Sequence, residues 1–96
     1  MSDTRPVITI PTSALDALST DASALLHSAL RPVTAHEKTG GVDASIARLT
    51  IMQRYAVPQA TRIEAVTALY RAIGFTGATT AVPPSVRVRV EESRSS

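Results

Sequence analysis

The sequence predicts one small, mainly helical α+β domain, and two kinds of pattern lead to that fold class. Three segments carry apolar residues at helical spacing and are bounded by residues typical of helix ends: 13–31, 43–56 and 58–73. Two short segments are rich in β-branched residues and are typical of strands: 7–10 and 85–91. Because the helical segments are much the longer, we expect helices to build most of the domain.

The first strand is expected over Val7–Ile10, where prolines at both ends flank four residues of high strand propensity. Proline cannot donate to a sheet ladder, so it confines a strand to an edge or to its ends. The second strand is expected over 85–91, because valine and arginine alternate from Val86 to Val90 and the arginines point outward. The simplest pairing joins these two strands, either within one chain or between chains.

The first helix is expected over 13–31. Thr12 or Ser13 supplies the N-terminal cap, and Asp16 stands in the first turn, where a carboxylate interacts favourably with the helix dipole. The apolar stripe of this helix consists of Leu15, Leu18, Ala22, Leu25, Leu26, Ala29 and Leu30. The Ser-Thr-Asp cluster at 19–21 leaves a second interpretation open, a break followed by a new helix, because these side chains compete for backbone hydrogen bonds.

A connector follows Pro32, and the pair of glycines at its end allows almost any turn. The second helix is expected over 43–56 and starts at Asp43, which suits the N-terminal cap. This helix carries two apolar lines. One consists of Leu49, Met52 and Ala56, and the other consists of Ile51 and Tyr55. We therefore expect it to be buried on more than one side.

The third helix is expected over 58–73, with Pro58 suited to its first turn and Gly74 suited to the left-handed position just past its end. One arc of this helix is apolar and consists of Ile63, Val66, Leu69, Tyr70 and Ile73. A second arc is made of small residues, namely Thr61, Ala65, Ala68 and Ala72. Such a helix is packed on two sides, and in a chain this short we expect another subunit to be the second neighbour.

The composition indicates a thin core that needs partners. Apolar residues make up 44% of the chain but aromatic residues only 3%, so the core must be built from small aliphatic side chains. We expect a single domain over 1–96, with polar tails at 1–5 and 92–96. No cysteine is present, and neither His27 nor His36 has a metal-ligand neighbour at helical spacing. We therefore expect no metal or other cofactor, and partner subunits as the remaining source of stability.

Other patterns argue against enzymes and membrane proteins. The sequence holds no catalytic, phosphate-binding or nucleophile motif, so we expect neither enzyme activity nor a small-molecule substrate. It also lacks an apolar run of about 18 residues and a basic-then-apolar leader. We expect a soluble chain, cytoplasmic or in a virion, without a signal peptide, a transmembrane segment or a membrane partner. The net charge of +2 is only weak evidence for nucleic-acid binding.

These patterns predict a non-catalytic structural or assembly protein, a small subunit of a larger oligomeric complex. Its expected partners are further copies of the chain and other protein subunits. A phage virion component, such as a head–tail connector, neck or capsid-accessory protein, is the concrete form of this hypothesis. The expected interface residues lie on the two strands and on the alanine arc: Val7, Ile8, Ile10, Ala65, Ala68, Ala72, Val86, Val88 and Val90.

One stretch supports a different hypothesis. The segment RYAVPQATRIEAVTAL resembles the helix-turn-helix of GntR-type winged-helix regulators, which typically reads RYGVSRATVREALRAL. The matching positions are Arg54, Tyr55, Val57, Ala60, Thr61, Glu64, Ala65, Ala68 and Leu69. The chain departs from the family pattern at Ala56, which replaces the glycine of the turn, and at Arg62, which stands where the family buries an aliphatic residue.

The resemblance implies a helix-turn-helix over 48–74, a wing hairpin over 79–90 and a DNA-binding transcriptional regulator with nucleic acid as its partner. The residues that would then contact DNA are Gln59, Thr61, Arg62, Arg71, Arg87 and Arg89. A recognition helix exposes a broad polar face to the base edges, whereas the polar stripe of helix 58–73 is narrow and contains a carboxylate. The assembly hypothesis therefore stays first, with DNA binding as the alternative.

Overall fold

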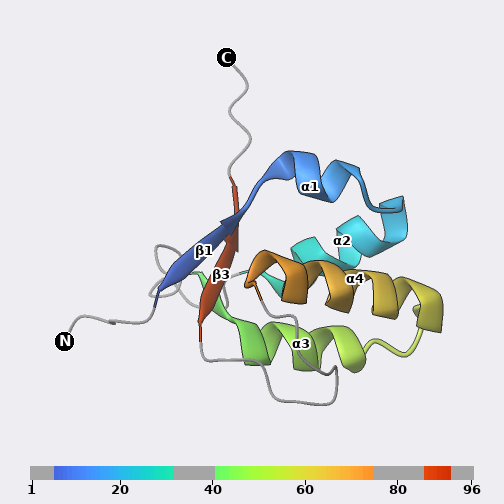
Figure 1. The fold of residues 1–96 in the computed structure, drawn as a ribbon. Coiled ribbons are helices and arrows are strands. Elements are labelled where there is room, and N and C mark those ends of the chain that lie inside the picture. Colours follow the sequence, from blue (N-terminus) through green and yellow to red (C-terminus); the bar gives the residue numbers. More distant parts are fainter. Residues whose placement is uncertain (1–5, 32–40, 75–85, 92–96) are drawn as a thin grey trace.

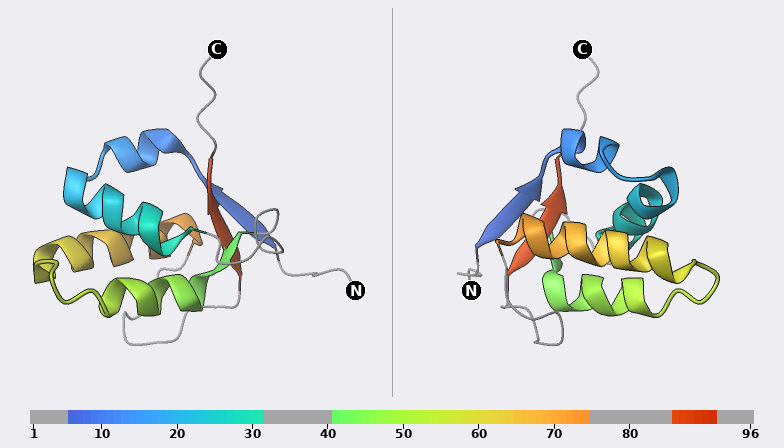
Figure 2. Two further views of the ribbon diagram at one scale, coloured as in Figure 1. Left: turned by 180° about the vertical axis from the view of Figure 1, so that it is seen from behind. Right: turned by 45° about the vertical axis from the view of Figure 1, so that its right-hand side comes forward.

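The structure is a computed structural model, and it describes residues 6–31, 41–74 and 86–91. Along the chain, the elements are β1 (Val7–Ile10), α1 (Thr12–Asp16), α2 (Thr20–Ala29), β2 (Val42–Asp43), α3 (Ala44–Met52), α4 (Gln59–Ala72) and β3 (Arg87–Val90) (Figure 1). The strands lie at one end of the molecule, and the described helices lie to one side of them (Figure 2). This arrangement confirms the predicted mainly helical α+β class.

Within the described residues, β3 is the central strand of a sheet with the order β1-β3-β2. It runs parallel to β1, with Val7 opposite Arg87 at the start of the register, and antiparallel to β2. At the other end of the pair, the Glu91 amide donates to the Ile10 carbonyl at 2.8 Å. The two terminal strands therefore pair within one chain, which is one of the two pairings expected from the sequence.

The sequence pattern does not predict β2, because a strand of two residues shows no periodicity. In β2, Val42 pairs with Val88 of β3. Gly41 precedes it with a φ of +79°, and a Cβ at this position would lie 2.7 Å from the Val88 carbonyl oxygen. This glycine therefore allows a close approach of two backbones as well as a turn. The rest of the expected connector, 32–40, lies outside the described residues.

The single helix expected over 13–31 is two helices, α1 and α2, so the interpretation with a break is confirmed. Ser19 is the N-cap of α2, and its Oγ accepts a hydrogen bond from the Ala22 amide at 3.2 Å. The Glu64 carboxylate on α4 accepts two more bonds, from the Ser19 amide at 2.8 Å and from the Ser19 hydroxyl at 2.9 Å. These bonds connect the start of α2 to α4 and stabilise the break in the helix at Ser19.

The other two helices start where the sequence predicts. Asp43 caps α3 as expected, but α3 ends at Met52, so the predicted end at 56 is wrong. The reason is that 53–58 must reverse the chain before α4, and the residue before a proline disfavours helical geometry. The helix α4 matches the predicted 58–73 to within one residue at each end, and Gly74 follows it with a φ of +75°.

The core lies between α2, α3, α4 and one face of the sheet. Its largest fully buried side chains come from all of these elements: Leu26, Ile51, Leu69, Val42 and Val88. Alanines at the helix contacts fill much of the remaining space, and Tyr70 is the buried aromatic residue of the described chain. The core therefore has the thin, aliphatic character that the composition predicts.

Candidate docking surface

The helix α3 buries only one of its two apolar sides. The buried side faces α2 and α4 and consists of Ala44, Ala47 and Ile51. On the outer side, successive turns carry Ile46, Leu49 and Met52, which are 50%, 53% and 47% exposed. A helix that carries apolar residues on both sides but packs on one side leaves the other side for a partner or for solvent.

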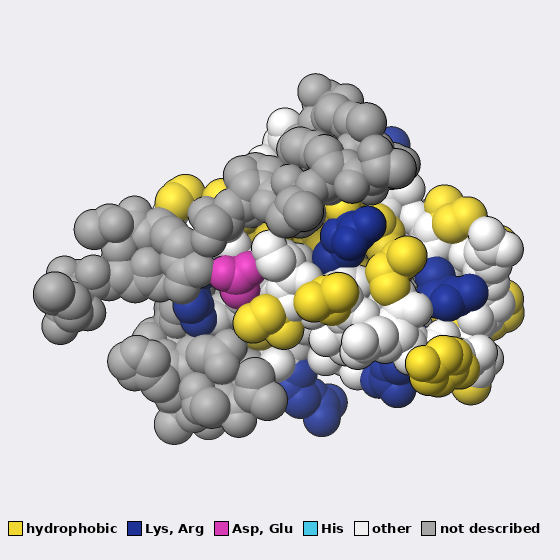
Figure 3. Space-filling model, turned by 90° about the horizontal axis from the view of Figure 1, so that it is seen from below, with side chains coloured by type: hydrophobic (Ala, Val, Ile, Leu, Met, Phe, Trp, Pro, Cys, Tyr) yellow, Lys and Arg dark blue, Asp and Glu magenta, His cyan; other side chains and the backbone are white. Residues whose placement is uncertain are grey.

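Two neighbouring residues extend this exposed apolar area. Ile63 on α4 is 57% exposed, and Tyr55, in the connection between α3 and α4, is 93% exposed. We call the combined region the α3 surface, which consists of Ile46, Leu49, Met52, Tyr55 and Ile63 together with Arg48 and Arg62. Figure 3 views the molecule from the side of α3 and shows hydrophobic side chains interspersed with Lys and Arg side chains, with an Asp or Glu side chain on the same face. Tyr, Met and Arg are residue types that are enriched at protein interfaces.

Neither arginine of the α3 surface contacts a carboxylate within the described residues. The guanidinium carbon of Arg48 lies 6.0 Å from the centroid of the Tyr70 ring, at the outer limit of a cation–π contact. The Nη1 of Arg62 donates to the Met52 carbonyl at 3.2 Å. The Nε atoms of both arginines are buried and have no hydrogen-bond partner. Two guanidinium groups therefore lie near exposed apolar side chains, and none of the carboxylates in the described ranges contacts them.

The described carboxylates are engaged or lie elsewhere. Asp43, Glu64 and Glu91 each accept a hydrogen bond from a backbone amide. Asp16 on α1 and Asp21 just after the start of α2 are exposed. In every view, α1 lies at the opposite end of the molecule from α3 (Figures 1 and 2). Of these two exposed aspartates, Asp16 lies on α1, whereas Asp21 lines a hollow beside Arg54 and Pro58 of the connection between α3 and α4.

Several of the interface residues predicted from the sequence lie in the chain's own core. The buried ones are Ile10, Ala65, Val86 and Val88. In this fold they are core residues, because they fill the space between the sheet and the helices. Val7 on the outer strand β1 is exposed, whereas Ile8 and Val90 are partly buried against the core. Ala68 and Ala72 are also partly buried, and both line a pocket.

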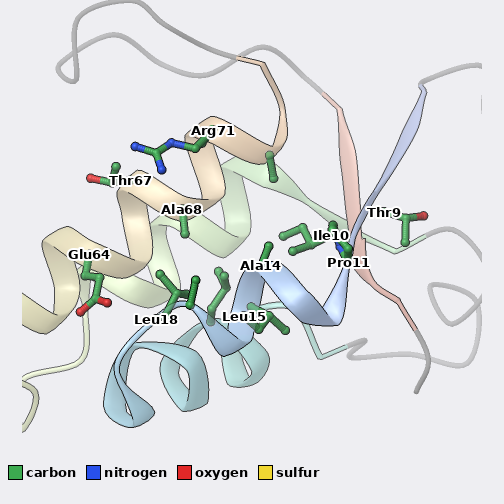
Figure 4. Close-up of a pocket in the computed structure, with 13 residues that line it drawn as sticks. Thr9, Ile10, Pro11, Ala14, Leu15, Leu18, Glu64, Thr67, Ala68 and Arg71 are labelled. Carbon is green, nitrogen blue, oxygen red and sulfur yellow. The ribbon is translucent and has the colours of Figure 1, made fainter. Parts of the chain in front are cut away.

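This pocket, the α1–α4 pocket, has a volume of about 500 Å³ and lies between α4 and the β1–α1 segment. Leu15 of α1 and Leu18, just past the end of α1, face Ala68 of α4 across it (Figure 4). Thr67 and Arg71 stand on the outer side of α4 at the edge of the pocket. The lining is mostly apolar, so the pocket suits an apolar group with a few polar contacts at its rim.

The residues of the DNA-binding alternative come from three separate places: the first turn of α4, the last turn of α4, and β3. Gln59 is exposed but Thr61 is buried. Arg62 is bonded to a backbone carbonyl at the end of α3, and Arg71 is exposed at the far end of α4. On β3, the Arg87 guanidinium donates to the Gly41 carbonyl, and Arg89 is partly buried. The described part of the expected wing is limited to 86–90.

The arrangement of α3 and α4 also bears on that alternative. The two helices lie side by side and run in opposite directions, joined by residues 53–58 (Figures 1 and 2). A helix-turn-helix joins helices at about 90–120° through a turn of about 3–4 residues. The pair described here therefore has the form of a helical hairpin with a longer connection.

The sequence did contain a signal for the α3 surface. The two apolar lines on the segment 43–56 predict burial on two sides, whereas the described elements cover only one side of α3. Periodicity records that a side is apolar but does not say which other element covers it. Tyr55 is exposed beyond the end of α3 at Met52, a position that periodicity does not determine. Ile63 belongs to the predicted apolar arc of α4 but is 57% exposed, because none of the described elements covers this position.

The described residues show no other chemistry that stands out. No group of three or more His, Cys, Asp or Glu side chains is placed to hold a metal ion in the described ranges. None of the described helices has the length and hydropathy needed to cross a membrane. Comparisons with protein-family models, with curated proteins and with solved structures found no match to this chain.

Proposed function

We propose that this chain is a non-catalytic assembly subunit that associates with further copies of itself through the α3 surface. The observation that carries the proposal is the row of half-exposed Ile46, Leu49 and Met52 beside two arginines for which the described residues provide no carboxylate contact. Large apolar side chains gathered with arginine at one place are typical of contact surfaces, whereas single exposed hydrophobic residues are not informative.

The expected energies are consistent with an interface of moderate strength. Covering the exposed half of a large apolar side chain is worth about 1 kcal/mol, so the five apolar residues of the α3 surface offer about 5 kcal/mol. Association costs at least about 4 kcal/mol in lost freedom of movement. The apolar contacts therefore need a further contribution, and carboxylates of a partner that bind the Arg48 and Arg62 guanidinium groups would supply it.

The thin core supports the same proposal, because a small domain gains stability when neighbours cover its surface. A phage virion subunit remains the concrete version of the assembly hypothesis predicted from size and partner dependence. The DNA-binding alternative remains a prediction from the sequence resemblance. This alternative requires that the affinity for DNA falls steeply as the salt concentration rises. A DNA titration at two salt concentrations measures this dependence.

The test is the solution mass of the untagged chain, measured by light scattering across a range of protein concentrations. We expect the mass to rise above that of the monomer, and Leu49→Asp to return it to the monomer value. Ala24→Asp is the matched control, because it places the same charge on an exposed position of α2 and should leave the assembly intact. A wild-type chain that stays monomeric at every concentration would overturn the proposal.

A further inference from the structure

We propose that two copies of this chain also pair along the outer edges of their β1 strands, antiparallel and centred on Ile8, so that their two sheets become one. This inference rests on the proposed self-assembly and adds a second contact to it. β1 and α3 lie in different parts of the molecule, so one copy can use both contacts at once (Figures 1 and 2).

β1 is an edge strand of the described sheet. In the strand order β1-β3-β2, it has a described neighbour on one side only. In both views of Figure 2, β1 lies outside β3, on the side away from the described helices. Val7 is 44% exposed, and Thr9 is also exposed. None of the described elements therefore covers the outer side of β1.

The register with β3 shows which backbone groups of β1 point outward. The carbonyl groups of Pro6 and Ile10 accept hydrogen bonds, at 3.0 and 2.8 Å, from amides at the start and just past the end of β3. Successive residues of a strand direct their backbone groups to opposite sides. Val7 and Thr9 therefore point their amides and carbonyls to the outer side, where each group needs a partner or water. We call these four groups the β1 edge.

The sequence of β1 does not protect this edge in the usual way. Natural edge strands often carry charged side chains or prolines that prevent pairing with another strand. No charged residue lies between Pro6 and Pro11, and both prolines stand outside the four residues of the strand. Those four residues are all β-branched, a type that favours cross-strand pairs. The β1 edge is therefore short but open to an extended partner.

A second copy satisfies the β1 edge completely in one register. When two β1 strands run antiparallel with Ile8 opposite Ile8, Val7 of each copy lies opposite Thr9 of the other. Both are then hydrogen-bonded pairs, so all four outward groups of each strand find a partner. A shift that sets Val7 opposite Pro11 would leave the Val7 carbonyl without a donor, because proline has no amide hydrogen. Because the segment is uncharged, no like charges meet.

This contact alone is too small to hold two free chains together. Stable interfaces bury about 1,200–2,000 Å² in total, and a pair of four-residue strands covers only part of that area. In an assembly formed through the α3 surface, the β1 edges are held at a high effective concentration. We therefore expect the β1 contact to form in the assembly and to be lost in the monomeric Leu49→Asp variant.

Disulfide cross-linking tests both the contact and its register, because the chain contains no cysteine. The two Cα atoms at position 8 would lie about 4.5 Å apart, a separation that a disulfide bridges. We expect mild oxidation of Ile8→Cys to give a covalent dimer on a non-reducing gel. Val7→Cys is the matched control, because its two copies are offset by about 7 Å along the strands as well as by the strand spacing. We expect at least about tenfold less dimer from this control.

A second pair of variants tests the contact without changing Ile8, which packs partly against the core. Val7→Cys and Thr9→Cys alter exposed residues only. Each variant alone should stay free of cross-links, whereas their equimolar mixture should give a covalent dimer, because positions 7 and 9 lie opposite each other. Light scattering before oxidation checks that every variant still assembles.

The outcomes separate this inference from the proposed function. If the variants assemble but neither Ile8→Cys nor the mixture cross-links, pairing at β1 is rejected and the α3 contact stands. Equal cross-linking of Val7→Cys and Ile8→Cys would reject the register. If Ile8→Cys cross-links equally well with Leu49→Asp added, pairing at β1 is supported and the α3 surface is not the source of the assembly. A chain that neither assembles nor cross-links would overturn both proposals.

Discussion

At the scale of single residues, Gly41 holds the most constrained position described. Its φ is +79°, and the Cβ of any other residue would lie 2.7 Å from the Val88 carbonyl oxygen and 3.0 Å from the carbonyl carbon. Both atoms belong to the backbone of the central strand and cannot move aside without disturbing β3. A glycine is required here for two reasons, the conformation and the space.

We expect Gly41→Ala to destabilise the fold by more than about 2 kcal/mol, because the left-handed conformation alone costs about 1–2 kcal/mol for an L-residue. Urea unfolding measures the loss. The control is Gly74→Ala, where φ is +75° but no atom lies within 4 Å of the added Cβ. That variant should show the conformational cost alone. Equal losses in the two variants would contradict the close contact with β3.

At the scale of elements, the contact between α2 and α4 depends on one short network. Ser19 caps α2, and Glu64 on α4 accepts hydrogen bonds from both its amide and its hydroxyl. The cap and the link between the two helices therefore share one side chain. Residues that share partners in this way do not act independently.

We expect Ser19→Ala to cost about 1 kcal/mol of unfolding free energy, the usual cost of losing an N-cap. Glu64→Ala should cost a comparable amount. The double variant should lose less than the sum of the two, with a coupling of at least about 0.5 kcal/mol. Chemical denaturation of the four chains completes the cycle. Additive losses would mean that the serine and the carboxylate act separately.

The strand β1 allows a second prediction at this scale. Ile10 is buried against the core, whereas Val7 on the same strand is exposed. We expect Ile10→Ala to cost about 2–4 kcal/mol and Val7→Ala less than about 1 kcal/mol, because only the first opens a cavity. Thermal unfolding of the two variants measures the difference. Similar losses would show that β1 does not pack as described.

At the scale of the whole molecule, we expect a small free energy of unfolding, because the core is built from few and mostly small aliphatic side chains. Leu26 is fully buried. Truncating it should cost about 2–5 kcal/mol, against a total stability of about 5–15 kcal/mol for domains in general. We therefore expect Leu26→Ala to approach unfolding at 37 °C. The control Leu49→Ala removes the same atoms from the α3 surface and should weaken assembly while nearly preserving the melting temperature of the monomer. Calorimetry and light scattering together test both statements.

How closely the structure matches the prediction from the sequence differs from one element to the next. The helix α4 matched its prediction closely because an amphipathic pattern, a proline at its start and a glycine past its end all agree. The break before α2 was one of two open interpretations of the cluster 19–21, and the structure shows that Ser19 of this cluster is the cap. The strand β2 was missed because its two residues pair only through contact with β3, which is distant in the sequence.

For the candidate site, the interface role of Ala68 and Ala72 stays a prediction. They line a pocket, as an accessible alanine arc should, but Ala65 on the same arc is buried within the chain. The α3 surface was not named at all. An apolar side of a helix gives the same pattern whether its neighbour is in the same chain, in another subunit or absent.

What the sequence alone determined is local: the class of the fold, the positions of its helices and terminal strands, and the aliphatic character of its core. These follow from periodicity, capping residues and composition, which act between residues close in the chain. Only the tertiary structure decided which apolar sides are covered, that β1 and β3 run parallel in one chain, and that the Nε atoms of Arg48 and Arg62 are buried without a hydrogen-bond partner among the described residues. The physical reason is that burial and charge pairing depend on which distant segments meet, and no local pattern records that.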